Sequence, residues 1–163
     1  MPRDNQITIG VADMKLSNNP DSTLVTYSLG SCLGITIYDP LVKVGGLLHV
    51  MLPESGNDKG SGSFNPFKYV DTGVPILFKE AYKYGASKNR LIVKVAGGAQ
   101  ILDDSGYFNI GKRNLAALRK LFWKNGVMID SEHVEGTVAR TVRMKIETGE
   151  VILSIGREKE IVL

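Results

Sequence analysis

The chain has 163 residues, of which 43% are hydrophobic and 23% charged, and its net charge is +3. This balance predicts one globular domain over residues 1–163, and no apolar run approaches the roughly 20 residues of a membrane-spanning helix. The N-terminal residues lack the apolar stretch of a secretory signal peptide, and the single cysteine cannot form an internal disulfide, so we expect a cytoplasmic protein.

Hydrophobic periodicity, followed in chain order, predicts a series of strands and two helices. The strands are expected at residues 6–14, 23–29, 33–38, 44–51, 91–96, 127–134, 141–146 and 151–155. One helix is expected at 67–84, where Pro75 predicts a break or a late start, and another at 110–125, with Asn109 as N-cap. The element order favours an α+β fold: a mostly antiparallel β-sandwich with two helices packed on one side.

Two connecting segments and the C-terminal stretch carry their own expectations. Residues 54–66 are rich in Gly, Ser and Asn and read equally well as a mobile loop or as a lid or binding segment that selects the substrate. Residues 103–106 predict a turn. Residues 157–160 are all charged and predict a solvated tail.

The most informative stretch is the β-hairpin expected from residues 33–38 and 44–51, which brings the only cysteine toward a histidine. If Tyr38 lies opposite Lys43, the same register sets Cys32 opposite His49. Directly opposed residues have Cβ atoms roughly 4.5–5.5 Å apart, a spacing that suits a thiol and an imidazole sharing a proton. A slip of one residue would turn the two side chains to opposite faces.

Each candidate residue has a structural alternative. A lone cysteine is commonly a small core residue, and His49 stands in an apolar strand where a hydrogen-bonded core histidine is the ordinary case. Small residues beside Cys32 leave room for a substrate carbonyl and for backbone N–H donors near Ser31 and Cys32. His133 is a competing base, which we interpret as a structural or surface residue.

Other chemistries have weaker support. One cysteine and two histidines do not give the ligand spacing of a metal site, and we expect no cofactor. The Gly97-Gly98 pair lacks the surrounding pattern of a phosphate loop, so close backbone packing is its expected role. Residues 30–34 have the shape of a nucleophile elbow, but strand-forming residues follow where an elbow requires a helix.

Four runs of residues carry a resemblance to a known family, the chemoreceptor glutamine deamidases called CheD. They are residues 26–32, 45–53, 94–99 and 109–114. In this resemblance the nucleophilic cysteine falls on Cys32, the histidine on His49 and the triad threonine on Thr26. Residues 135–140, Glu-Gly-Thr-Val-Ala-Arg, differ from the Gly-Gly-Thr-x-Gly-Arg form expected there.

The resemblance implies a fold similar to that of toxin-type cysteine deamidases and a Cys-His-Thr thioester mechanism without a cofactor. It implies hydrolysis of glutamine side chains on methyl-accepting chemotaxis receptors to glutamate and ammonia. The implied partners are receptor arrays, reached without a membrane anchor, and a CheC-like phosphatase.

Two other functions remain open from the residues. The chain could be a non-enzymatic module that docks on receptors or on a CheC-like protein; a Cys32 pKa near the free value of about 8.5 would favour it, whereas an active site predicts a lower one. A nucleic-acid binder is weaker still, because the positive charges are scattered. The densest basic stretch, on the second helix, fits either a solvated face or an acidic partner: Lys112, Arg113, Arg119, Lys120 and Lys124.

Overall fold

The computed structural model describes residues 5–101 and 109–163, and its strands form two five-stranded sheets. The first sheet has the strand order β1-β3-β8-β9-β10 and the second the order β2-β5-β4-β6-β7. The strands are β1 (Asn5–Thr8), β2 (Asp13–Ser17), β3 (Ser22–Leu29), β4 (Leu33–Asp39), β5 (Val44–Val50), β6 (Ile92–Gly97), β7 (Ser131–Val134), β8 (Arg140–Lys145), β9 (Val151–Ile155) and β10 (Lys159–Val162). The turn predicted at 103–106 lies outside the described residues.

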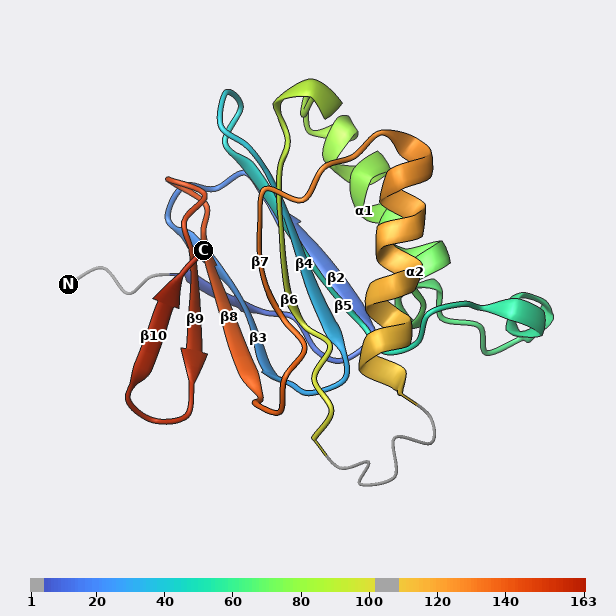
Figure 1. Cartoon of the computed structure of the whole chain (residues 1–163). Helices are drawn as coiled ribbons and strands as arrows, with labels where there is room; N and C mark the ends of the chain where they lie inside the picture. The colour runs from blue at the N-terminus through green and yellow to red at the C-terminus, as the bar shows by residue number, and fades with distance from the viewer. Residues whose placement is uncertain (1–4, 102–108) are drawn as a thin grey trace.

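Two α-helices, α1 (Val70–Lys83) and α2 (Ile110–Asn125), lie on one side of the second sheet (Figure 1). Their apolar faces pack on β4 and β5 in one buried cluster. α1 starts later than predicted and runs through Pro75 without ending, because its buried face compensates for the hydrogen bond that proline cannot donate. Neither described helix is long and apolar enough to cross a membrane. Short 3-10 turns complete the helical elements: η1 (Gly56–Gly60), η2 (Pro66–Lys68) and η3 (Lys88–Arg90).

A second apolar cluster contains residues of both sheets, including Leu24 of β3, Val142 of β8 and Leu47 of β5. Most strand pairs are antiparallel, while β1 with β3 and β6 with β7 are parallel. The chain therefore forms a single α+β domain with two mixed sheets and two helices on one side. The predicted class and the placement of the helices are confirmed.

Two strand predictions are wrong in detail, and one strand was not predicted. The strand expected at 6–14 is divided by a turn in which Ala12 has a φ of 56°, so β1 joins one sheet and β2 the other. The strand expected at 127–134 is shorter, since only β7 pairs with β6. Residues 157–160 are exposed, as predicted, but the sequence did not predict the strand β10, in which Lys159 and Glu160 pair with β9; such charges are usual on an edge strand.

The hairpin of β4 and β5 forms as predicted, but its register differs by two residues. Tyr38 pairs with Gly45 and Asp39 with Val44, so Lys43 belongs to the loop, where its φ is 54°. Asp39 remains in the strand because its carboxylate accepts hydrogen bonds from the loop N–H groups of Leu41 at 2.9 Å and Val42 at 3.4 Å. A shift of two residues preserves the face on which each side chain lies.

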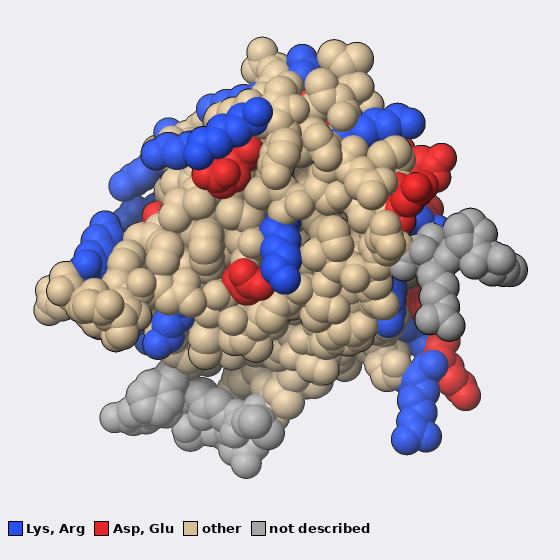
Figure 2. Space-filling view, turned by 180° about the vertical axis from the view of Figure 1, so that it is seen from behind, with Lys and Arg blue, Asp and Glu red and all other residues tan. Residues whose placement is uncertain are grey.

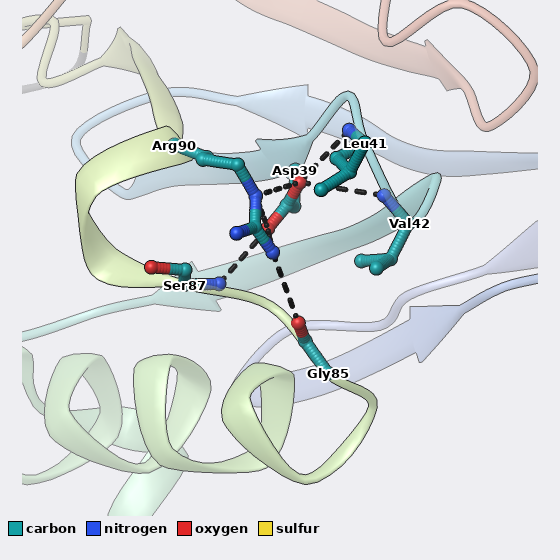
Figure 3. A network of polar contacts seen from close by, with 6 residues as sticks. All are labelled: Asp39, Leu41, Val42, Gly85, Ser87 and Arg90. Atoms are coloured by element: carbon teal, nitrogen blue, oxygen red, sulfur yellow. Dashed lines mark hydrogen bonds and ion pairs between the residues drawn. The ribbon is translucent and has the colours of Figure 1, made fainter.

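Asp39 also connects the hairpin loop to the segment between α1 and β6 (Figure 3). Its side chain is fully buried and accepts hydrogen bonds from Arg90 Nε at 3.0 Å and from the Ser87 N–H at 2.9 Å. Burial alone would raise the pKa of Asp39, but the bonds from Arg90 and the three backbone N–H groups outweigh it and hold the pKa at about 2. The ionised carboxylate is therefore a stabilising element of the fold.

Asp39→Asn is expected to lower the free energy of unfolding by about 1–3 kcal/mol at neutral pH, because Arg90 then loses a buried charged partner. The folded pKa of about 2 lies below the ordinary 3.8, so this contribution is complete above pH 3.8 and is lost as the pH falls toward 2. Urea unfolding across this range measures it. Glu158→Gln, an exposed control, should leave the curve unchanged; an equally stable Asp39→Asn would contradict the assignment.

Candidate active site

His49 of β5 and Thr26 of β3 meet between the two sheets. Thr26 Oγ1 lies 2.7 Å from His49 Nδ1. Both side chains are buried, with exposed fractions of 0% for Thr26 and 2% for His49. The structure thus brings two of the three predicted site residues into direct contact, although their strands belong to different sheets.

The hydrogen bonds of Thr26 select the tautomer of His49. The single hydroxyl proton of Thr26 is donated to the Ile9 carbonyl at 2.8 Å, so the hydroxyl oxygen is left to accept from His49 Nδ1–H. With its proton on Nδ1, the imidazole carries a lone pair on Nε2. Among the described residues this Nε2 is buried and has no hydrogen-bond partner. His49 is therefore held as a base.

Cys32 is the residue directly before β4, on the same face of the hairpin as His49. Gly34 is the direct partner of His49, and strand alternation puts Cys32 on the same side as Gly34. The predicted direct opposition of Cys32 and His49 is therefore wrong. The two are diagonal neighbours, at a Cα spacing of roughly 7–8 Å for a regular ladder. The thiol makes no hydrogen bond to Nε2 in this structure.

Gly34 keeps the space beside the imidazole open. A Cβ atom at this position would lie 2.8 Å from Leu29 Cδ1, closer than side-chain carbons pack. Gly34 lies directly opposite His49 in the hairpin, so its hydrogen atom takes the place of a side chain beside the imidazole.

The segment that carries Cys32 forms one wall of a pocket of about 1200 Å³. The pocket is lined by residues 28, 30–32, 98–101, 109–112 and 135–137. The segment is held by the N–H groups of Gly98 and Ala99, which donate to the carbonyls of Cys32 and Gly30 at 2.9 Å each. A Cβ at Gly97 would lie 2.2 Å from the Cys32 carbonyl oxygen, so the predicted close packing of this glycine pair is confirmed.

Burial shifts both titrating groups toward their uncharged forms. Burial raises the pKa of the Cys32 thiol, and the backbone N–H of Cys32 lowers it by less. Burial also lowers the pKa of His49. The direction at Cys32 is opposite to the one predicted for an active-site thiol. The resting site therefore pairs a neutral thiol with a neutral imidazole, and a thiolate would form only as the proton passes to Nε2.

His133 has a different role from His49. Its Nδ1 accepts a hydrogen bond of 2.7 Å from Nε of Arg140, which is 2% exposed. The guanidinium also donates to the carbonyls of Gly97 at 3.3 Å and Glu135 at 2.7 Å, so the pair fixes backbone near the pocket. This geometry agrees with the interpretation of His133 as a structural residue.

The segment 54–66 lies apart from the pocket residues described above. Ser55 binds the Asp71 carboxylate through its N–H and its hydroxyl, both at 3.0 Å, and Asp58 accepts a hydrogen bond from the Tyr69 hydroxyl. Within the described part of the pocket wall, this segment contributes no residue. Its part in substrate choice remains a prediction.

Metal binding finds no support in the described part of the chain. No group of three or more His, Cys, Asp or Glu side chains lies there in a position to share a metal ion. The pocket walls at 98–101, 109–112 and 135–137 were not predicted to belong to the site. The available signal was that residues 94–99 and 109–114 belong to the runs that carry the family resemblance.

Comparison with known proteins places this sequence in one group of relatives. The sequence profile of the family described as CheD chemotactic sensory transduction matches residues 51–155. A protein of Syntrophus aciditrophicus, named probable chemoreceptor glutamine deamidase CheD 1, is 50% identical over 90% of this chain and 92% of its own length. Proteins named probable chemoreceptor glutamine deamidase CheD are 47% identical in Solibacter usitatus (96% of this chain, 94% of the relative) and 41% in Pyrococcus horikoshii (90% of each).

Among solved structures, a Bacillus licheniformis hypothetical protein, YfiH, is similar with a TM-score of 0.45 at 12% sequence identity. The likeness covers 77% of this chain and 50% of the YfiH chain.

Proposed function

Because this chain belongs to the CheD family, we propose that it is a chemoreceptor glutamine deamidase, which converts glutamine side chains of methyl-accepting chemotaxis receptors to glutamate and releases ammonia. The observation that carries the proposal is the Thr26–His49 hydrogen bond of 2.7 Å. It leaves a buried imidazole with a free Nε2 on the face of the hairpin that holds the only cysteine. This arrangement supports Cys32 as nucleophile, His49 as acid and base, and Thr26 as the residue that orients His49.

In the first half of the reaction Cys32 Sγ attacks the carboxamide carbon while its proton passes to His49 Nε2. Backbone N–H groups near Ser31 and Cys32 stabilise the oxyanion. The imidazolium then protonates the departing nitrogen, and ammonia leaves a thioester on Cys32. Because thiol and imidazole both begin uncharged, the thiolate exists only once the substrate has brought the two groups into line.

In the second half, water replaces ammonia. Neutral His49 takes a proton from the water as its oxygen attacks the thioester carbon, and the same proton then returns to the departing sulfur. Glutamate and the free thiol are released. Thr26 keeps the proton of the resting imidazole on Nδ1 throughout, so Nε2 faces the reacting atoms in both halves.

Mass spectrometry of a receptor cytoplasmic fragment tests the proposed function. Incubation with the protein should convert particular glutamines to glutamates, seen as a small mass gain of single peptides together with an equal amount of ammonia. A cognate receptor that remains unchanged, both with and without a CheC-like protein, would contradict the proposal.

Thr26→Val is expected to reduce kcat by at least about 10-fold with little change in KM, because Nδ1–H loses its acceptor and the imidazole loses its fixed tautomer. Steady-state ammonia release measures the effect. Thr23→Val is the matched control, since Thr23 lies on the same strand and makes neither of these contacts. Equal kcat values for the two variants would remove Thr26 from the site.

One observation favours a second candidate, a non-enzymatic module that docks on chemoreceptors or on a CheC-like phosphatase. Burial raises the pKa of the Cys32 thiol, as expected for a packed cysteine. This candidate predicts that Cys32→Ala preserves binding to receptor fragments and that wild type releases no ammonia. Release of ammonia by wild type alone would reject it.

Partners and location follow the family proposal. We expect a cytoplasmic protein that acts at receptor arrays and binds a CheC-like phosphatase; co-sedimentation with receptor membranes, with and without that phosphatase, tests both partners. Figure 2 shows Lys and Arg side chains spread over one face with Asp and Glu among them, a pattern unlike a continuous nucleic-acid surface. On α2, Arg119 pairs with Glu132 at 3.0 Å, which reduces the basic character of that helix.

The apolar cluster shared by the two sheets supports a β-sandwich similar to that of toxin-type cysteine deamidases. Superposition of an experimental structure on such a deamidase, with the cysteine and histidine aligned, would test this similarity.

A further inference from the structure

Asn114 is a polar residue buried in the apolar face of α2. Its exposed fraction is 0%, and the neighbouring buried residues of the helix, Leu115 and Leu118, are apolar. Asparagine is less favourable than leucine or alanine inside a helix, because its side chain competes for backbone hydrogen bonds. Neither helix formation nor apolar packing explains an asparagine at this position.

The amide of Asn114 connects the two strands of the catalytic hairpin beyond the end of their ladder. Nδ2 donates to the carbonyls of Ser31 and Met51, each at 3.0 Å. The last ladder pair is Leu33 with Val50, so both carbonyls lie just past the final rung. Ser31 directly precedes Cys32, and Met51 follows His49 by two residues. Asn114 therefore holds the segments that carry the thiol and the imidazole at a fixed spacing.

The bond to Ser31 also sets the direction of the next N–H group. The carbonyl of Ser31 and the N–H of Cys32 belong to one peptide unit, and in a trans peptide they point in opposite directions. Asn114 draws the Ser31 carbonyl toward α2. The Cys32 N–H is consequently directed away from α2.

The side-chain oxygen of Asn114 has no partner in the described part of the chain, which indicates that this position requires the two N–H donors of Nδ2. Among the described residues, Asn114 Oδ1 is buried and has no hydrogen-bond partner, which costs the desolvation of that oxygen. An apolar side chain of similar size would avoid this cost. Asparagine is thus favoured only where its NH₂ group performs a task that leucine cannot.

We propose that Asn114 is a positioning residue for deamidation: it orients the Ser31–Cys32 peptide so that the Cys32 N–H stabilises the oxyanion, and it fixes the thiol segment to the end of the His49 strand. This inference rests on the proposed function and deepens it. Asn114 acts through Cys32 and does not itself touch the substrate.

Asn114→Leu and Asn114→Asp remove the donors at nearly constant volume, and both should lower kcat by about 10²-fold with KM little changed, the loss typical of one oxyanion donor. The rate at which iodoacetamide alkylates Cys32 should change by less than about 3-fold, because this reaction develops no oxyanion. The matched control is Leu118→Ala, which destabilises the same helix through its apolar face and should retain kcat below its unfolding temperature. If the Asn114 variants deamidate as fast as Leu118→Ala, or lose alkylation in proportion to kcat, the proposal is wrong.

A measurement on the wild-type protein avoids dependence on folded variants. A receptor peptide with a glutamine-like aldehyde forms a hemithioacetal, in which a new S–C bond forms and the thiol proton ends on the former aldehyde oxygen. The amide proton of Cys32 should move downfield in the NMR spectrum as it hydrogen-bonds that oxygen, and an unchanged amide proton would overturn the proposal. Failure of wild type to deamidate would instead reject the proposed function itself.

Discussion

Cys32→Ala is expected to abolish deamidation, with ammonia release falling by more than about 10³-fold while the protein remains folded. In the proposed mechanism the thiol forms the covalent intermediate, and the chain has no other cysteine to replace it. Because alanine is smaller and Cys32 is only partly buried, the unfolding temperature should change little. Ser154→Ala, on β9 of the other sheet, is the control. A wild-type rate of ammonia release by Cys32→Ala would show that another residue is the nucleophile.

The single cysteine allows the same prediction to be tested without a substitution. Iodoacetamide can modify only one thiol, so activity should disappear in proportion to the fraction of chains that gain one adduct. Since burial raises the pKa of Cys32, alkylation without substrate should be slow at neutral pH and should accelerate only above the ordinary thiol range. Rapid alkylation at pH 6 would show that a thiolate is already present in the resting protein.

Local features of the chain were predictable from its residues. The hairpin of β4 and β5 follows from two apolar runs on either side of a short polar connection, and the helix α2 follows from the helical spacing of its apolar residues. The register was not predictable, because it depends on whether Asp39 belongs to the strand or to the loop. The Asp39 carboxylate binds the loop N–H groups of Leu41 and Val42. It also binds Arg90 and Ser87, which are distant in the sequence, so the hairpin residues alone do not determine the register.

The site was predictable only where the hairpin itself determines it. The shared face of Cys32 and His49 follows from strand alternation, which a shift of two residues leaves unchanged. The partner of His49 lies on the other sheet, so only the family resemblance pointed to Thr26. Asn114 was missed, although a polar residue within the apolar face of a predicted helix is a signal visible in the sequence.

His49→Gln is expected to reduce deamidation by at least about 10³-fold, because glutamine offers no nitrogen that can take the thiol proton and return it to ammonia. His133→Gln is the matched control: it replaces the only other histidine and retains an acceptor for Arg140. The control should keep wild-type kcat. The opposite result, with His133→Gln inactive and His49→Gln active, would assign the base to His133.

The pH dependence of the wild type provides an independent test of His49. Burial lowers the pKa of His49 below the ordinary 6.5, so the imidazole stays neutral down to pH 6.5. We therefore expect kcat/KM to stay constant until the pH falls below 6.5. The unfolded chain takes up the proton first, so the stability contributed by His49 is complete above 6.5 and decreases as the pH falls toward the folded pKa. His49→Gln should lose this part of the pH dependence of unfolding. If the acid limb of kcat/KM lies above 6.5, a group other than a buried neutral imidazole controls the reaction.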